Sequence, residues 1–392
     1  MIKVKAELAK TNLFKSELNL LWLELKRIFT EFNIIALLLI CFCLNLLLLY
    51  VDLKADFTLD ILSISRGRYN ELVASFTGEP SEAKARMVAN QLQEVEKAKK
   101  HGLFEYKDDV GNSHYILEDE LILNNIKDNM TYTYFYNSEL ENLLQIADEM
   151  PNGDFYRQVY GQRYIPRFSK NDGLGPFLLY KNSSWLLILF FLYVLAPLFW
   201  EDSCRLRSIQ YRQGAALRRN VSSVVRSSLF MLALLVALFR MQDLLFYHYN
   251  LGIGNLTNPL YASKIFAYTP FKGSLGLFLI CDYIAKFLGL AVFILCFIFF
   301  SLICERKYVS SILAMILIIT LMFDDTGARS MLNPLCLLHI ASELRTAEPL
   351  YLFGRNFVKS YVSLCLPLLT LILVFNIIRW GVKHVQCRNQ KV

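Results

Sequence analysis

The sequence predicts an α-helical polytopic membrane protein with six transmembrane helices and one large, mainly helical extracytoplasmic domain between the first and second. Of its 392 residues, 55% are hydrophobic, and the mean hydropathy is +0.36. A membrane-spanning helix needs about 20 apolar residues. Six apolar runs approach or exceed that length. A buried helix in the core of a large soluble protein explains an apolar run of about ten residues, but it does not explain six runs of nearly 20 or more. The six runs are 34–51, 184–200, 227–247, 277–303, 308–323 and 361–380.

Charge orients these spans. With both termini cytoplasmic, the inner segments 1–33, 201–226, 304–307 and 379–392 carry 18 basic and 7 acidic residues, and the short outer loops carry 6 and 4. Short loops follow this positive-inside bias, whereas long segments cross largely regardless of charge. The net charge of +7 is therefore a topology signal and gives no reason to expect nucleic acid as a partner. The chain is expected in the cell membrane, with the bilayer as its surroundings.

The N-terminal segment, residues 1–33, is expected to form an amphipathic helix on the cytoplasmic membrane surface. Its apolar residues recur at helical spacing around Trp22, and its lysines fall on the other side. An ordinary solvated helix that packs on a soluble partner is the alternative. The run 34–51 that follows lacks a small-residue cleavage pattern, so it is expected to stay as an anchor.

The extracytoplasmic domain is assigned to residues 52–183, a length that can bury its own core. It holds no cysteine, so no disulfide framework is expected. One helix should begin at Ser81 and end near Gly102. A capping-box pattern predicts that a second helix begins at Ser138 and ends before Pro151. The residues 113–123 between them fit a strand or a short helix equally well.

Two pairs of opposite charges lie near the outer ends of apolar runs. Arg240 and Asp243 are one helical turn apart in the third run, and Asp282 and Lys286 are one turn apart in the fourth. Opposite charges at this spacing pair and lower the cost of burial. The pairs either form an outer gate that lines a route for cargo, or are interfacial ion pairs with no part in transport.

The last exterior loop, residues 324–359, is too apolar for a plain linker. A short helix is expected after Asn333 and Pro334, and the segment as a whole is expected to dip back into the outer leaflet. The final span, 361–380, leads into a cytoplasmic tail of residues 381–392. No metal-ligand cluster and no catalytic grouping is recognisable, so the chain is not expected to be an enzyme.

The cytoplasmic segment 201–226 is short, rich in arginine and held between two apolar runs. A short helix between two rigid spans transmits rotation, whereas a long flexible loop absorbs it. Its guanidinium groups suit acidic and carbonyl groups on a partner, and its apolar residues suit a groove. The candidate contacts are Glu201, Arg205, Arg207, Tyr211, Arg212, Gly214, Leu217, Arg218 and Arg219. The alternative role for the arginines is to bind anionic headgroups and fix the topology.

This order of segments resembles the permease subunit of type-2 ABC exporters, in the Gram-positive bacterial branch that handles peptides, antibiotics and similar amphiphiles. The resemblance covers most of residues 14–380. Its matching positions are Glu201, the coupling helix from Arg205 to Arg219 with Gly214, the stretch Tyr69 to Leu72 with Gly78, Asn333 with Pro334, and Phe353 with Gly354. Tyr211 and Ala215 depart from the family, which often has Thr and Arg there.

The resemblance implies a transport subunit whose energy is supplied by another polypeptide. The sequence contains no GxxxxGK[ST] phosphate loop and no Rossmann glycine cluster. ATP and Mg²⁺ are therefore expected on separate cytoplasmic ABC ATPase subunits, and a second permease half, identical or homologous, is expected as a partner. Other hypotheses are a membrane receptor or immunity protein that binds a peptide through residues 52–183, and a gradient-driven carrier or channel.

Overall fold

The structure is a computed structural model, and most of the chain is described in it. The described residues are 32–107, 113–148, 153–161, 163–194, 214–303, 334–352 and 355–366, with the single positions 312, 316, 369, 372 and 376. The predicted surface helix, most of the segment 201–226 up to residue 213, and the cytoplasmic tail lie outside the described residues. So do most positions of the fifth and sixth predicted spans.

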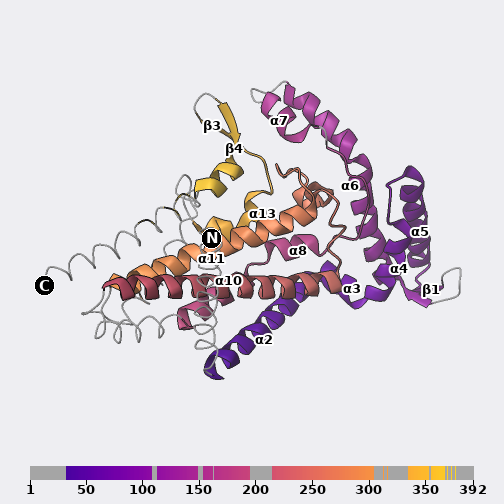
Figure 1. The fold of residues 1–392 in the computed structure, drawn as a ribbon. Helices are drawn as coiled ribbons and strands as arrows, with labels where there is room; N and C mark the ends of the chain where they lie inside the picture. Colours follow the sequence, from indigo (N-terminus) through magenta and orange to yellow (C-terminus); the bar gives the residue numbers. More distant parts are fainter. Residues whose placement is uncertain are drawn as a thin grey trace, which may run out of the picture.

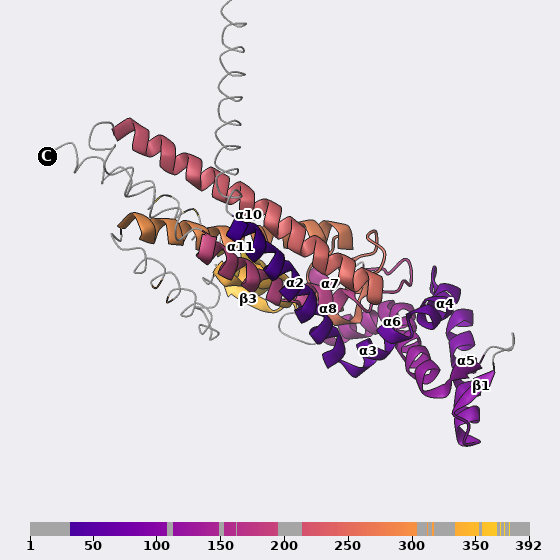
Figure 2. The ribbon, with the colours of Figure 1, turned by 90° about the horizontal axis from the view of Figure 1, so that it is seen from below.

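Four helical segments are long and apolar enough to cross a membrane, which supports the membrane class predicted from the sequence. They lie in α2 (Phe32–Ala55), α8 (Leu174–Leu179) with the helical residues 182–194, α10 (Gly214–Asn250) and α11 (Leu275–Ile303). The candidate spans themselves are Ile34–Ala55, Leu174–Val194, Val225–Asn250 and Leu275–Cys296. Figures 1 and 2 show α10 and α11 running side by side along much of the molecule.

The second candidate span is interrupted. Its helix α8 ends at Leu179, Tyr180 has an extended backbone (φ −66°, ψ 125°), and the helix resumes at residue 182. The span therefore begins ten residues before the predicted start at residue 184. A break inside a membrane-spanning helix leaves carbonyl groups without helical partners. Such groups must be satisfied by protein or water.

Five helices form what we call the helical head, residues 57–160. They are α3 (Phe57–Ile64), α4 (Arg66–Phe76), α5 (Glu82–Lys100), α6 (Ile116–Asp148) and α7 (Gly153–Tyr160). The strands β1 (Glu105–Lys107) and β2 (Ser113–Tyr115) pair antiparallel, with Tyr106 opposite His114. The carboxylate of Asp56 accepts hydrogen bonds from the first N–H groups of α3, which begins the head directly after the first span.

Two local predictions in the head have different outcomes. The helix expected from Ser81 is confirmed, because the Ser81 hydroxyl accepts from the Lys84 N–H and caps α5. The helix start expected at Ser138 is wrong, because Ser138 lies inside the 33-residue helix α6. The ambiguous residues 113–123 contain both alternatives, since β2 ends at Tyr115 and α6 begins at Ile116.

The region before the sixth predicted span is partly helical, as expected. It contains the 3-10 helix η4 (Pro334–His339) and α13 (Ile340–Glu343). A hairpin follows, in which β3 (Pro349–Leu352) pairs antiparallel with β4 (Arg355–Val358). The loop between α10 and α11 holds two short 3-10 helices, η1 (Leu260–Ala262) and η2 (Lys264–Phe266).

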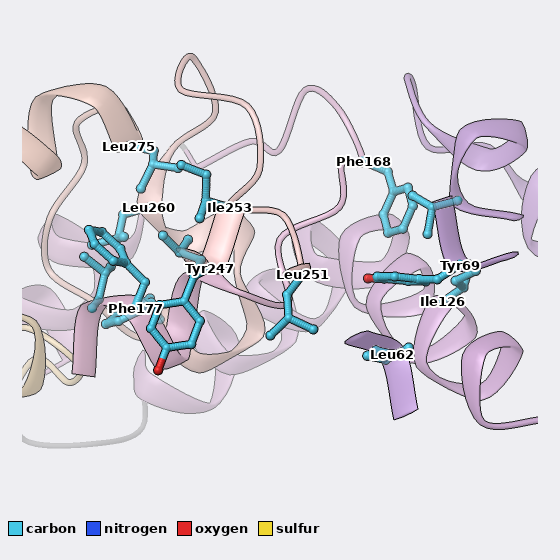
Figure 3. Close-up of a cluster of buried hydrophobic side chains, with 14 of the residues drawn as sticks. Leu62, Tyr69, Ile126, Phe168, Phe177, Tyr247, Leu251, Ile253, Leu260 and Leu275 are labelled. Carbon is cyan, nitrogen blue, oxygen red and sulfur yellow. The ribbon is translucent and has the colours of Figure 1, made fainter. Parts of the chain in front are cut away.

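One buried apolar cluster joins the head to the candidate spans. Figure 3 shows Tyr69 and Ile126 of the head in the same cluster as Phe177 of α8 and Tyr247 of α10. Leu62, Phe76, Tyr247, Leu251 and Phe278 are completely buried within it. Burial on this scale stabilises the contact, at about 25 cal/mol for each Å² of apolar surface removed from water. The head and the spans are therefore packed as one body in this part of the chain.

Candidate functional site

Four charged side chains from two candidate spans form one buried network, which we call the charge tetrad: Arg240, Asp243, Asp282 and Lys286. Arg240 lies 2.6 Å from the Asp282 carboxylate and 3.4 Å from the Asp243 carboxylate. Lys286 lies 2.9 Å from the other oxygen of Asp282. The sequence predicted the two pairs within each helix, and the structure adds the contact between Arg240 and Asp282 that joins them.

The tetrad lies inside the candidate spans rather than at their ends. Arg240 comes ten residues before Asn250, the last residue of its span, and Asp282 comes seven residues after Leu275, the first residue of its own. At 1.5 Å per helical residue, both lie roughly 10 to 15 Å from that end. The exposed fractions are 8% for Arg240, 0% for Asp243, 2% for Asp282 and 1% for Lys286.

The charges in the tetrad balance, with two cations and two carboxylates. Burying ions costs several kcal/mol each unless they are paired and hydrogen-bonded. Ionisable groups inside membrane-spanning segments are rare and commonly mark a route for ions or substrates. Each oxygen of Asp282 has a cationic partner, and Arg240 has two carboxylates within reach. Each of the four charges therefore has an opposite charge within 3.4 Å.

A third span reaches the tetrad through an amide. The Asn45 side chain on α2 is fully buried and donates to Asp243 over 2.9 Å and to Gln242 over 3.1 Å. The Tyr180 hydroxyl, at the break after α8, donates to the Asn45 oxygen over 3.1 Å. Gln242 in turn donates to the Phe42 carbonyl. A lone polar residue in the apolar run 34–51 was the available sequence signal for Asn45, and sequence reasoning missed it.

Arg240 also donates a hydrogen bond to a backbone carbonyl at the break in the second span. Its guanidinium donates to the Phe177 carbonyl over 3.4 Å and lies 4.1 Å from the centre of the Phe177 ring. Phe177 is in the last turn of α8, where carbonyls lack helical partners and the helix dipole favours a cation. Arg240 thus contacts α8, its own helix and α11, and it is the centre of the site.

A second buried arginine holds the head against the loop between α10 and α11. The Arg163 guanidinium donates to the Val159 and Ala267 carbonyls over 3.2 Å each, to the Thr269 carbonyl over 2.5 Å, and to the Tyr136 hydroxyl over 3.3 Å. It also contacts the Tyr160 and Tyr261 rings, at 4.6 and 4.9 Å from their centres. Burial raises the pKa of Tyr160 to about 12.

A buried carboxyl group lies directly before α8. Asp172 accepts hydrogen bonds from the amides of Asn125 and Asn129, one turn apart on α6, over 3.0 and 2.9 Å. Burial raises the pKa of Asp172 to about 7. Sequence reasoning singled out neither Arg163 nor Asp172. The only signal for Asp172 was the spacing of the two asparagines, and Arg163 had none.

The coupling residues predicted from the sequence are only partly within the described chain. Glu201, Arg205, Arg207, Tyr211 and Arg212 lie outside it. Gly214 is the first residue of α10, and Leu217, Arg218 and Arg219 lie in its first two turns. In the part of the chain that the structure describes, no group of three or more His, Cys, Asp or Glu side chains is placed to hold a metal ion.

A comparison of the chain with protein-family models, with curated proteins and with solved structures found no match. Function is therefore argued from the geometry of the tetrad and of the helices that carry it.

Proposed function

We propose that the chain is the membrane-spanning permease subunit of an ATP-driven ABC exporter that moves a peptide, an antibiotic or another amphiphile. A separate cytoplasmic ATPase would bind ATP and Mg²⁺, and a second permease half would complete the path. In this proposal the protein lies in the cell membrane, both termini are cytoplasmic and residues 52–183 are outside. The four apolar helices support a membrane protein, and the transport role goes beyond them.

The observation that carries the proposal is the unbroken length of α10. This helix has 37 residues, from Gly214 to Asn250, and so is about 55 Å long. Its first turns include the proposed coupling residues Arg218 and Arg219, and Arg240 and Asp243 follow further along. Near its far end, Tyr247 is completely buried in the cluster shared with the head. A single rod thus connects the proposed ATPase contact, the tetrad and the head.

In this proposal the tetrad allows that rod to move between two positions. Arg240 is 2.6 Å from Asp282 on α11 but 3.4 Å from Asp243 on its own helix. If nucleotide-driven closure of the ATPase tilts α10 away from α11, Arg240 keeps Asp243 and Lys286 keeps Asp282, so no charge is left alone. We propose that this exchange opens the outer end of a path between spans.

The experiment is recovery of the partner from native membranes. The tagged chain is purified in detergent, and co-purifying ATP hydrolysis is measured for the wild type and for Arg218→Ala/Arg219→Ala. Arginines at the centre of an interface commonly contribute more than about 1 kcal/mol each, so we expect at least about a tenfold loss of bound ATPase. Alanine preserves the helix, so α10 should remain intact.

The matched control is Arg86→Ala/Lys100→Ala, which removes one arginine and one lysine from exposed positions on α5 of the head. It should retain the ATPase fully. If no ATP-hydrolysing chain co-purifies with the wild type, or if both double variants lose it equally, the proposal fails. Recovery of a bound extracellular peptide without an ATPase would favour the receptor or immunity hypothesis.

A further inference from the structure

Two cations, Arg66 and Lys170, lie near the end of a candidate span, and neither has a carboxylate partner among the residues that the structure describes. The Arg66 guanidinium lies 3.7 Å from the centre of the Tyr249 ring, near the end of α10. The Lys170 ammonium lies 4.2 Å from the centre of the Tyr69 ring and donates to the Asn70 oxygen over 2.7 Å. Within the described residues, neither cation forms a salt bridge.

Lys170 contacts Tyr69 and Asn70, which lie one helical turn after Arg66 on α4, so the two cations are near each other. Partial burial and the nearby Arg66 charge together lower the pKa of Lys170 to about 8. Two neighbouring positive charges with no acidic partner among the described residues are stabilised when an anion joins them. The aromatic rings orient both side chains but carry no net charge, and a cation–π contact contributes only about 1 to 2 kcal/mol.

A stripe of exposed apolar side chains leads along α10 to these cations. The members recur every three or four residues, so they lie on one face of the helix. They are Phe230, Leu234, Leu238, Met241, Leu245 and Tyr249, and each is between 43% and 66% exposed. An apolar face of this length on a candidate span is suited to lipid chains. Tyrosine at the end of a span commonly marks the level of the headgroups.

We propose that Arg66 and Lys170 bind the phosphate of one anionic phospholipid whose acyl chains lie along the apolar stripe of α10. The two cations supply the charge, and Arg66 supplies paired N–H donors that match phosphate oxygens. Tyr249 connects the two parts of the site, since its ring contacts Arg66 and it is the last member of the stripe. The proposal requires the membrane location of α10 and is independent of transport.

The bound lipid would join the head to the spans. Arg66 is the first residue of α4 in the head, Lys170 is in the loop that leads to α8, and Tyr249 is on α10. A phosphate between these cations removes their repulsion and links three segments. We therefore expect the purified chain to be more stable with an anionic phospholipid than with a zwitterionic one.

The test is native mass spectrometry of the full chain after incorporation into nanodiscs of phosphatidylcholine with a small fraction of phosphatidylglycerol. The wild type should retain phosphatidylglycerol selectively. Each basic residue near a membrane contributes about fivefold to anionic lipid affinity, so Arg66→Gln/Lys170→Gln should lower the apparent affinity about 25-fold. Arg86→Gln/Lys100→Gln, with the same charge change on α5, should leave it unchanged.

Two further measurements test the lipid site without relying on the folding of the double variant. Arg66→Lys retains the charge and should keep most of the bound lipid, even if the double variant folds poorly. The melting temperature of the wild type should rise with phosphatidylglycerol and not with the same concentration of inorganic phosphate. Equal retention of both lipids by the wild type would overturn the proposal. So would stabilisation by phosphate alone, or a second copy of the chain covering the stripe.

Discussion

The balance of charges in the tetrad predicts how variants of its residues should differ in stability. Asp282→Asn removes one negative charge and leaves Arg240 and Lys286 with Asp243 as the only carboxylate of the tetrad. Lys286→Met removes one positive charge and leaves the two carboxylates with Arg240. The double variant Asp282→Asn/Lys286→Met restores balance, because Arg240 and Asp243 remain as a pair. The double variant should therefore be more stable than the Asp282→Asn variant.

The magnitude follows from burial. Asp282 and Lys286 are 2% and 1% exposed, so each charge is almost entirely out of water. Removing one partner of a buried pair costs about 3 to 5 kcal/mol, whereas replacing both with apolar groups of similar size is often near neutral. We expect a coupling free energy of about 2 kcal/mol or more between the two sites. That value is well above the few tenths expected of independent sites.

The assay is a double-mutant cycle on the free energy of unfolding of the full chain in mixed micelles. The matched control is the pair Glu82 and Arg86 on α5, which has the same spacing of four residues but is 61% and 74% exposed. The cycle with Glu82→Gln and Arg86→Met should give a coupling below about 0.5 kcal/mol. Equal coupling energies in the two cycles would refute the argument, as would a double variant that is no more stable than Asp282→Asn.

Three further predictions concern the contacts between the head and the spans. The raised pKa of Asp172 means that the folded state favours the neutral acid, so the free energy of unfolding should fall as pH rises from about 4 through about 7. In melting curves, Asp172→Asn should reduce this dependence of stability on pH. Arg163→Lys keeps the charge but loses the forked donors, and should lower the free energy of unfolding by about 2 kcal/mol or more in a denaturant titration. Gly252 has φ +77°, and an added Cβ would lie 2.8 Å from the Lys170 side chain, so Gly252→Ala should cost about 1 to 2 kcal/mol by the same titration. Gly67→Ala, in an open helical position, should be neutral or stabilising.

The sequence was most informative where a single helix determines the geometry. Ser81 predicted the start of α5, because a serine cap acts on N–H groups only two or three residues away. The pairing of Arg240 with Asp243 followed from their spacing for the same reason. The apolar runs predicted that spans exist, because hydropathy depends on composition rather than on neighbouring segments.

Contacts between segments were not predictable in the same way. An apolar run does not reveal its depth or its rotation, so the sequence did not show that Arg240 meets Asp282 on another helix. The error at Ser138 has a related cause. Tyr132 and Tyr136 of α6 donate hydrogen bonds to the Tyr261 and Ala267 carbonyls, far along the chain. These tertiary contacts support α6 just before Ser138, where a local capping pattern predicted a new start.

The charges of the tetrad bear on how α8, α10 and α11 can move relative to one another. Apolar residues of similar volume often hold buried helices together as well as ion pairs do, so stability alone is a weak reason for four charges there. Charged contacts are directional, and a small shift changes which partners are within reach. Arg240 lies between a carboxylate on its own helix and one on α11, and it also contacts the Phe177 carbonyl at the end of α8. A cluster of this kind restricts three helices to a few relative positions, and the proposed transport function, if it alternates between two states, would require that restriction.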